Sequence, residues 1–259
     1  MMKPNVAEFR FYEELNDFLS APRRKRSFEY GFQGDPAIKD AIEALGVPHT
    51  EVDLVLVNGV SVDFSYRLQP GDRVAVYPVF EALDIAPVTR LRPQPLRRTR
   101  FVLDVHLGKL ARLLRLLGFD AGYQRDWDDR EIIRRAREAQ AIILTRDRGI
   151  LKNRAVTHGY CVRSSDPWRQ ISEVFKRFDL RGSIRPFTRC SACNGIIEPV
   201  AKTEILERLP PKTRRHYDEF HRCRTCDRIY WKGSHYAALR ERLATALGLP
   251  KGRHPDLHA

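Results

Sequence analysis

The sequence lacks any long apolar run. No stretch of its 259 residues approaches the ~18 to 20 uninterrupted apolar residues needed to span a bilayer. The opening segment MMKPNVAEFRFYEEL also lacks the apolar region of a signal peptide. Only five cysteines are present, and nothing indicates secretion, so disulfides are not expected to stabilise the fold. These absences predict a cytoplasmic protein without a membrane segment.

Acidic residues are scarce in the second part of the chain. Residues 1–90 contain 10 Lys or Arg and 14 Asp or Glu, whereas residues 91–259 contain the remaining 36 and 19, a net charge of +17. A positive field of this size favours phosphate contacts, so nucleic acid is the leading partner class. A solvated basic surface is the alternative.

The first 84 residues combine strand and helix patterns. Alternating apolar residues predict strands, and DPAIKDAIEALGV (35–47) predicts one helix. Turns at Asn58-Gly59 and Pro70-Gly71 separate further strands. We therefore predict a small α+β domain over 1–84.

This segment resembles ubiquitin-like (β-grasp) domains of the sulfur-carrier type, MoaD and ThiS. Their sequences also show the VNG turn and the PGDRVAVYP strand. Sulfur carriers end in a free Gly-Gly, whereas here Pro78 leads into more chain. The resemblance therefore implies a module for binding or positioning, with a protein partner as one option, rather than sulfur transfer.

A linker follows at 85–99. Prolines 87, 93 and 95 limit regular structure there, and five arginines lie within 85–100. These arginines either contact phosphate or are solvated.

Strands alternate with helices over 100–182, which indicates a parallel sheet covered on both faces. In the first helix Leu107, Leu110, Leu114 and Leu117 fall on one face. The predicted strands are FVLDV, FDAGYQ, AIILT and YCVRSS, and the predicted helices are HLGKLARLLRLLG, EIIRRAREAQ and WRQISEVFKRF.

Acidic residues follow two of these strands. Asp104 ends the FVL strand and Asp147 follows AIILT, while Asp129 begins the helix before the third strand. Carboxyl ends of parallel strands share one edge of a sheet, so we expect these acids to converge. Converging carboxylates in a basic domain require cations, and Mg²⁺ or Mn²⁺ prefers such oxygen ligands. The acids therefore predict metal-dependent hydrolysis of phosphodiesters.

Each acid also has a structural interpretation. Asp128, with Glu131 at the third helical position, fits a capping box, and Asp166 before Pro167 fits an N-cap. Asp120 fits a solvated loop. Asp147 could simply begin a turn, although three charges in Arg146-Asp147-Arg148 at a strand end favour a ligand.

Cations near these acids are candidates for binding RNA phosphates. Lys109 is a candidate in the catalytic centre, and Arg146 and Arg148 would bind phosphate while keeping Asp147 ionised. Arg112 and His235 complete the candidate substrate-binding set, although His235 also fits a packing role.

Four of the five cysteines form the pairs CSAC (190–193) and CRTC (223–226). Two such knuckles predict a tetrahedral Zn²⁺ site made by Cys190, Cys193, Cys223 and Cys226. Four thiolates leave no open position, so the zinc would be structural. We assign 183–245 to this ribbon and a C-terminal helix, and 246–259 to a tail. Cys161 is expected to be a buried core residue.

Several motifs in order resemble the PIN-like ribonuclease domain at the C-terminus of the Mut-seven exonucleases. They are D-x-x-LGKLARxLRxLGxD from Asp104 to Asp120, the pair Asp128-Asp129, LTRDR from 144, and YWxGSH at 230–235. The resemblance implies an α/β PIN-like fold with an appended zinc ribbon, and Asp104, Asp129 and Asp147 as metal ligands. PIN enzymes generally use a fourth acid, for which Asp166 is only a candidate.

The sequence thus predicts a metal-dependent ribonuclease. The alternative is an RNA-binding or ribosome-associated module on the same scaffold with little or no turnover. Within PPKTRRHYDEFHR (210–222), Tyr217 and Phe220 could stack bases or belong to a core.

Overall fold

A computed structural model describes most of the chain. The described residues are 5–78, 91 and 99–249, with the backbone alone for Ser234 and His235. The predicted linker, apart from Leu91 and Thr99, and the last ten residues of the predicted tail lie outside this range. Among the described residues, no helix has the length and apolarity to cross a bilayer.

The chain folds into two compact units. The first holds residues 1–98 together with 147–161, and the second holds 99–146 together with 162–259. The segment after Arg146 thus belongs to the N-terminal unit, whereas the sequence places it inside a domain at 100–182. The predicted domain boundaries stay predictions.

The N-terminal unit contains a mixed sheet of five strands in the order β2-β1-β5-β3-β4. β1 is parallel to β5 and antiparallel to β2, and β3 is antiparallel to β5 and β4. The elements are β1 (Asn5–Phe11), β2 (Phe28–Phe32), α1 (Ile38–Ala44), β3 (Leu54–Val57), β4 (Val60–Ser61) and β5 (Arg73–Tyr77).

Alternation explains why this sheet has one buried face. Along β1 every second residue is buried, and Phe9 and Phe11 are at most 1% exposed. Ile38 and Ile42 of α1 are fully buried as well. The hairpin between β3 and β4 turns at Asn58 and Gly59, which have positive φ values of 52° and 84°. Such a two-residue turn suits the twist of paired strands, and this prediction is confirmed.

The same unit continues after Arg146 with two short elements and the loop between them. They are α4 (Arg148–Lys152) and β9 (Gly159–Cys161). Cys161 is buried at 7% exposure, as predicted.

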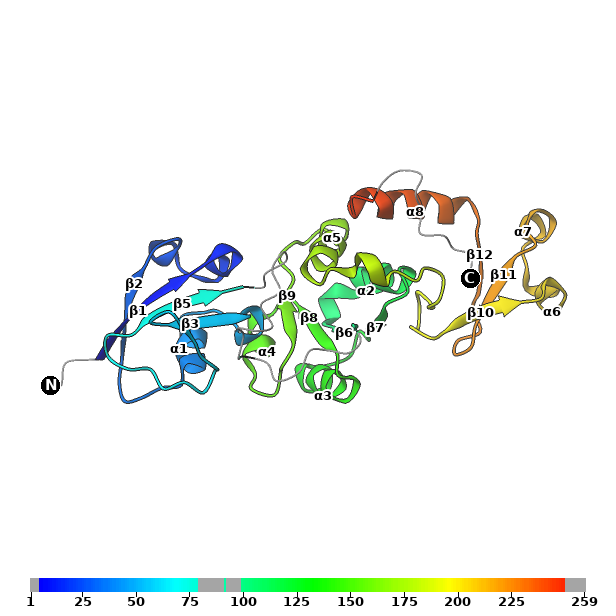
Figure 1. Cartoon of the computed structure of the whole chain (residues 1–259). Coiled ribbons are helices and arrows are strands. Elements are labelled where there is room, and N and C mark those ends of the chain that lie inside the picture. Colours follow the sequence, from blue (N-terminus) through cyan, green and yellow to red (C-terminus); the bar gives the residue numbers. More distant parts are fainter. Residues whose placement is uncertain (1–4, 79–90, 92–98, 250–259) are drawn as a thin grey trace. The chain divides into compact units, whose positions relative to one another are not determined.

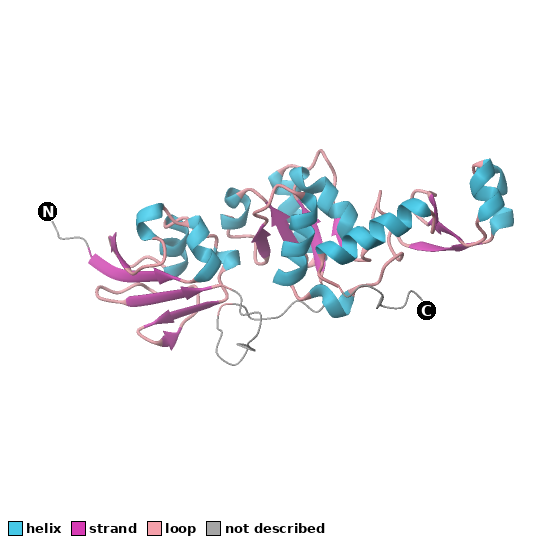
Figure 2. Cartoon of the chain, turned by 90° about the horizontal axis from the view of Figure 1, so that it is seen from above, coloured by secondary structure: helices cyan, strands magenta, loops and turns pink. Residues whose placement is uncertain are grey.

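In the second unit, strand β6 lies between β7 and β8. β6 is parallel to both β7 and β8, which confirms the predicted parallel sheet. Figures 1 and 2 show helices on both sides of these strands, with α3 on one side and α5 on the other. The elements are β6 (Arg100–Leu103), α2 (Gly108–Leu116), β7 (Asp120–Gly122), α3 (Asp129–Ala139), β8 (Ile142–Thr145) and α5 (Pro167–Arg177).

The apolar face of the first predicted helix is buried. Leu107, Leu110 and Leu114 are fully buried, and Leu117 is 5% exposed. α2 packs against α5 and β7, so the leucine spacing read from the sequence places this helix correctly.

The third sheet is small and antiparallel. Its strands lie in the order β10-β11-β12, and Figure 1 shows them beside the short helices α6 and α7. A longer helix, α8, follows. The elements are β10 (Ile197–Val200), α6 (Lys202–Ile205), α7 (Pro211–His216), β11 (Phe220–Cys223), β12 (Ile229–Trp231) and α8 (Ser234–Ala246).

Candidate active site and cysteine cluster

Asp104 follows β6, and Thr145 is the last residue of β8. Their side chains are hydrogen-bonded at the carboxyl ends of these two strands. The amide of Asp104 still continues the ladder and donates to the Leu144 carbonyl at 3.0 Å. Its side chain is buried at 7% exposure, and Oδ2 accepts a hydrogen bond from Thr145 Oγ1 at 2.7 Å. Thr145 is fully buried. The sequence predicted Asp104 at this edge but assigned no role to Thr145, although its place before Arg146-Asp147 was a usable signal.

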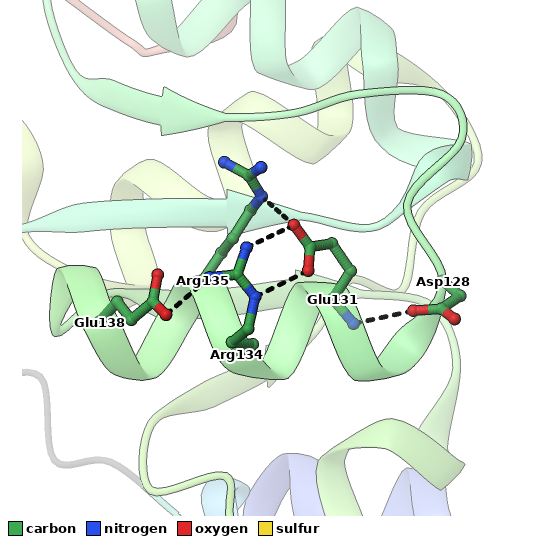
Figure 3. A network of polar contacts seen from close by, with 5 residues as sticks. All are labelled: Asp128, Glu131, Arg134, Arg135 and Glu138. Atoms are coloured by element: carbon green, nitrogen blue, oxygen red, sulfur yellow. Dashed lines mark hydrogen bonds and ion pairs between the residues drawn. The ribbon is translucent and has the colours of Figure 1, made fainter.

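Asp128 and Asp129 have different environments at the start of α3. Asp128 caps the helix because its Oδ1 accepts from the Glu131 amide at 2.8 Å (Figure 3). This confirms Asp128 as the N-cap, whereas the side chain of Glu131, the second residue of the predicted capping box, bonds to arginines instead. Asp129 lies in the exposed first turn.

The exposed face of α3 contains a network of ion pairs. Both carboxylate oxygens of Glu131 accept from Arg134, and Oε1 also accepts from Arg135 at 2.7 Å (Figure 3). Arg134 also donates to Glu138 at 2.6 Å. These hydrogen bonds, first from Arg134 and then from Arg135, lower the pKa of Glu131 to about 2. Glu131 is therefore committed to its neighbours rather than to a ligand.

Asp147 begins α4, in the N-terminal unit. Its side chain is exposed, and Oδ1 accepts from the Gly149 amide at 2.7 Å, so it serves as the helix N-cap. Asp166, the candidate fourth acid, caps α5 by accepting from the amides of Trp168 and Arg169 at 3.1 and 3.0 Å. The turn and cap interpretations of both residues are confirmed, and the proposed metal role of Asp147 is left as a prediction.

The candidate phosphate ligands lie on the surface. Lys109 and Arg112 are exposed on α2, and Arg146 and Arg148 are exposed beside Asp147. Their exposure suits contact with a polyanion. The side chain of His235 lies outside the described atoms.

Four cysteines form the only metal-type cluster among the described residues. Their ligand atoms lie within 4.8 Å of one another, and no other group of three or more His, Cys, Asp or Glu in the described ranges does the same. Asp104 and Asp129 belong to the second unit, and Asp147 belongs to the first.

Sulfur distances in the cluster fit a metal rather than disulfides. Cys190 Sγ lies 3.6 Å from Cys226 Sγ, and Cys193 Sγ lies 3.4 Å from Cys223 Sγ. A disulfide requires about 2.05 Å, whereas tetrahedral Zn–S bonds of about 2.3 Å place neighbouring sulfurs about 3.8 Å apart. All five cysteines are free thiols. The predicted four-cysteine set is thus assembled.

The thiols of the cluster differ in acidity. Burial raises the pKa of Cys190, but hydrogen bonds from Tyr230 Oη and from the amides of Cys193 and Ala192 outweigh it and lower the pKa to about 6. Desolvation and hydrogen bonds with neighbouring thiols raise the pKa of Cys193 to about 12. Tyr230, whose Oη lies 2.9 Å from Cys190 Sγ, is a site residue that the sequence did not single out.

Arg115 connects the first knuckle to the parallel sheet. It is 2% exposed, and its Nη1 donates to the carbonyls of Ala192 and Ser191 at 2.8 and 3.3 Å. Nε donates to the Ala121 carbonyl at 2.8 Å. Burial lowers the pKa of this guanidinium, while Cys190 and Cys193 oppose the shift. Sequence reasoning missed Arg115, although a cation inside a leucine-rich helix was a signal.

Asp120 was expected in a solvated loop, and this was wrong. It begins β7 and accepts from Asn194 Nδ2 at 2.7 Å and Arg189 Nη2 at 3.1 Å. Asn194 Oδ1 in turn accepts from the Ala121 amide at 3.1 Å. Both partners flank the first knuckle, so Asp120 connects β7 to that knuckle. The sequence alone does not predict this contact.

The aromatic residues between the knuckles belong mainly to a core. Phe220 is 2% exposed and packs with Ile205 and Leu209. Tyr217 is half-buried against the same cluster. Of the two interpretations left open by the sequence, core packing is confirmed for Phe220.

Comparison with known proteins identifies two families. The family model described as Mut7-C RNAse domain matches residues 99–243, and the one described as Mut7-C ubiquitin matches residues 4–84. The first match covers more than half of the chain. No significant match was found among the curated proteins or the solved structures.

Proposed function

Because this chain belongs to the Mut7-C RNAse domain family, we propose that it is a ribonuclease that hydrolyses RNA phosphodiester bonds with the help of Mg²⁺ or Mn²⁺. The observation that supports this most directly is the buried carboxylate of Asp104, held by Thr145 where two parallel strands end. Ligand sites of parallel sheets lie beyond this edge. The net charge of +17 over 91–259 supports RNA as the substrate class.

Asp104, Asp129 and Asp147 would hold the cation. Their donor chemistry fits, since a hard divalent ion takes carboxylate oxygens. When bound, such an ion neutralises phosphate charge and makes water a better nucleophile. The hydrogen bond from Thr145 leaves Oδ1 of Asp104 with only a long contact of 3.4 Å from the His106 amide, so this oxygen is the candidate ligand atom.

Cationic side chains would position the RNA. Arg146, Arg148 and Arg112 would bind phosphates on either side of the scissile bond, and Lys109 would place the reacting phosphate near Asp104. Of the four, Lys109 is proposed as the cation closest to the reaction.

The cysteine cluster would hold a structural Zn²⁺. Its four sulfurs lie at distances close to those of a tetrahedral thiolate site. The cation would replace the thiol protons and tie the first knuckle to the second. Through Arg115, the same knuckle is fixed to α2 and β7.

The experiment compares cleavage of mixed cellular RNA by the full chain in Mn²⁺, Mg²⁺ and EDTA. Asp104→Asn, Asp129→Asn and Asp147→Asn are each expected to lower the rate by at least about 100-fold, because each removes a ligand charge. Asp128→Asn is the matched control beside Asp129, because asparagine still caps α3. Equal rates for Asp128→Asn and Asp129→Asn would argue against Asp129 as a ligand.

A second candidate function is RNA binding without turnover. The fourth acid favours it, because Asp166, its only candidate, caps α5 by accepting from the amides of Trp168 and Arg169. In that case wild type and Asp147→Asn leave RNA equally intact with every metal while both shift it on a gel. Cleavage that depends on Mn²⁺ or Mg²⁺ and on Asp147 excludes this candidate.

A further inference from the structure

The segment that follows Asp147 is docked on the ubiquitin-like domain. Residues 147–161 belong to the same compact unit as the N-terminal sheet. Hydrogen bonds connect the two at the start, middle and end of the segment. The domain contributes the turn Glu13–Phe18, helix α1 and the turn His49–Glu51.

Glu51 holds the end of the segment. It is 1% exposed, and its Oε1 accepts a hydrogen bond from the amide of Cys161 in β9. A buried carboxylate is unfavourable unless its hydrogen bonds are made in the fold. The ubiquitin-like domain therefore contains a buried acid that accepts a hydrogen bond from the docked segment.

His49 holds the middle of the segment. Its Nε2 donates to the Val156 carbonyl at 2.8 Å, and its Nδ1 lies 2.6 Å from Glu43 Oε1. Carbonyl oxygens only accept, so the hydrogen of this contact is on Nε2. His49 is 6% exposed, so this contact is shielded from water. Lys152 adds a contact nearby, donating to the Glu43 carbonyl at 2.9 Å.

Arg148 holds the start of the segment, directly after Asp147. Its guanidinium lies 4.8 Å from the ring centroid of Phe18, and Nη2 donates to the Asp17 carbonyl at 3.4 Å. Cation–π contacts at exposed sites are weak. This contact is therefore weaker than those of Glu51 and His49, but it is adjacent to the candidate catalytic acid.

We infer that the ubiquitin-like domain positions Asp147, because Glu51 and His49 fix the segment that begins with this candidate ligand. This inference rests on the proposed ribonuclease function and deepens it. Glu51 and His49 touch the segment and not the reacting atoms, so they are positioning residues. A candidate ligand on a short helix needs such support, because an error of about 1 Å in a reacting group lowers rates by roughly 100-fold.

The test uses full-length variants in the Mn²⁺-dependent RNA cleavage assay, together with hydrogen exchange. Glu51→Ala removes the acceptor for the Cys161 amide, whereas Glu51→Gln keeps an oxygen there and is the rescue variant. Asp72→Ala is the matched control: Asp72 is a buried acid of the same domain, 4% exposed, and it accepts only from its own surroundings, Asn58, Tyr66 and Gln69. It therefore reports loss of domain stability alone.

We expect Glu51→Ala to lower kcat on the order of 10- to 100-fold while KM changes less than about twofold, because exposed arginines still bind RNA. Amides of 148–161 should exchange faster in Glu51→Ala than in Asp72→Ala, and Glu51→Gln should restore both readouts. Equal kcat and exchange in Glu51→Ala and Asp72→Ala would overturn the inference, and so would a raised kcat, which indicates masking of Asp147. If the wild-type chain cuts no RNA, the ribonuclease proposal is contradicted. Faster exchange of the segment in Glu51→Ala would then still support its docking on the ubiquitin-like domain.

Discussion

The ubiquitin-like domain and the cysteine ribbon are both small, yet they are stabilised in different ways. The domain buries large side chains such as Phe9, Phe11 and Leu15 without any metal-type cluster among its described residues. The ribbon has two small apolar clusters, one of which consists of Cys190, Ile197 and Cys223. Below a certain size an apolar core rarely suffices, and a metal takes its place. The four-cysteine cluster indicates that the same chain uses both solutions.

The largest effect is expected from removing the metal. Cys223→Ser, or a strong chelator, should abolish zinc binding and unfold the ribbon, because structural zinc contributes an apparent ~10 to 16 kcal/mol in comparable small sites. Zinc content by elemental analysis and regional hydrogen exchange measure this. Cys161→Ala is the control, since that cysteine lies outside the cluster. Unchanged zinc in Cys223→Ser would refute the four-thiolate assignment.

The next effect concerns the ubiquitin-like domain. Phe11→Ala should lower the free energy of unfolding of this domain by about 3–5 kcal/mol, because it leaves a cavity in the core, while zinc content stays constant. Thermal melting with zinc analysis checks both. Val60→Ala, at a position 62% exposed, should change stability by less than about 0.5 kcal/mol. A loss of zinc in Phe11→Ala would mean that the two regions are not stabilised independently.

A smaller effect tests the connection between ribbon and sheet. Arg115→Met should lower the free energy of unfolding by about 1–3 kcal/mol, because carbonyls of Ala192 and Ala121 lose a buried donor. Denaturant unfolding at fixed zinc concentration measures it. Arg112→Met, exposed on the same helix, is the matched control. No difference between the two variants would show that the ribbon is stabilised by its metal alone.

The smallest effect concerns the exposed ion pairs of α3, which stabilise the surface of a helix rather than an apolar core or a metal site. The pKa of Glu131 is lowered from 4.5 to about 2 by Arg134 and Arg135. A carboxylate with a lowered pKa stabilises the fold above pH 4.5, and the contribution disappears as the pH falls through about 2. Glu131→Gln should remove the loss of stability between pH 4.5 and about 2 and leave stability at other pH values unchanged. Thermal unfolding followed by circular dichroism over this pH range measures it. Because exposed pairs contribute little, a large loss of stability at neutral pH would contradict this ranking.

Periodicity and turn chemistry predicted most of the elements. The leucines of α2, the Asn58-Gly59 hairpin and the parallel pairing of β6 and β8 follow from short-range patterns. The four cysteines were also identified correctly, since two knuckles at this spacing have few other uses. Side chains whose partners lie far away in sequence could not be predicted in this way, as Asp120 shows.

The sequence by itself determined the classes of secondary structure, the basic second part and the identity of the four clustered cysteines, because each depends on residue type and local spacing. Only the tertiary structure decided that Thr145 holds Asp104, that Arg115 fixes the first knuckle, and that Glu51 accepts from Cys161. These three contacts join residues 41, 77 and 110 positions apart. Their partners are chosen by how the sheets and helices pack, and no local pattern contains that information.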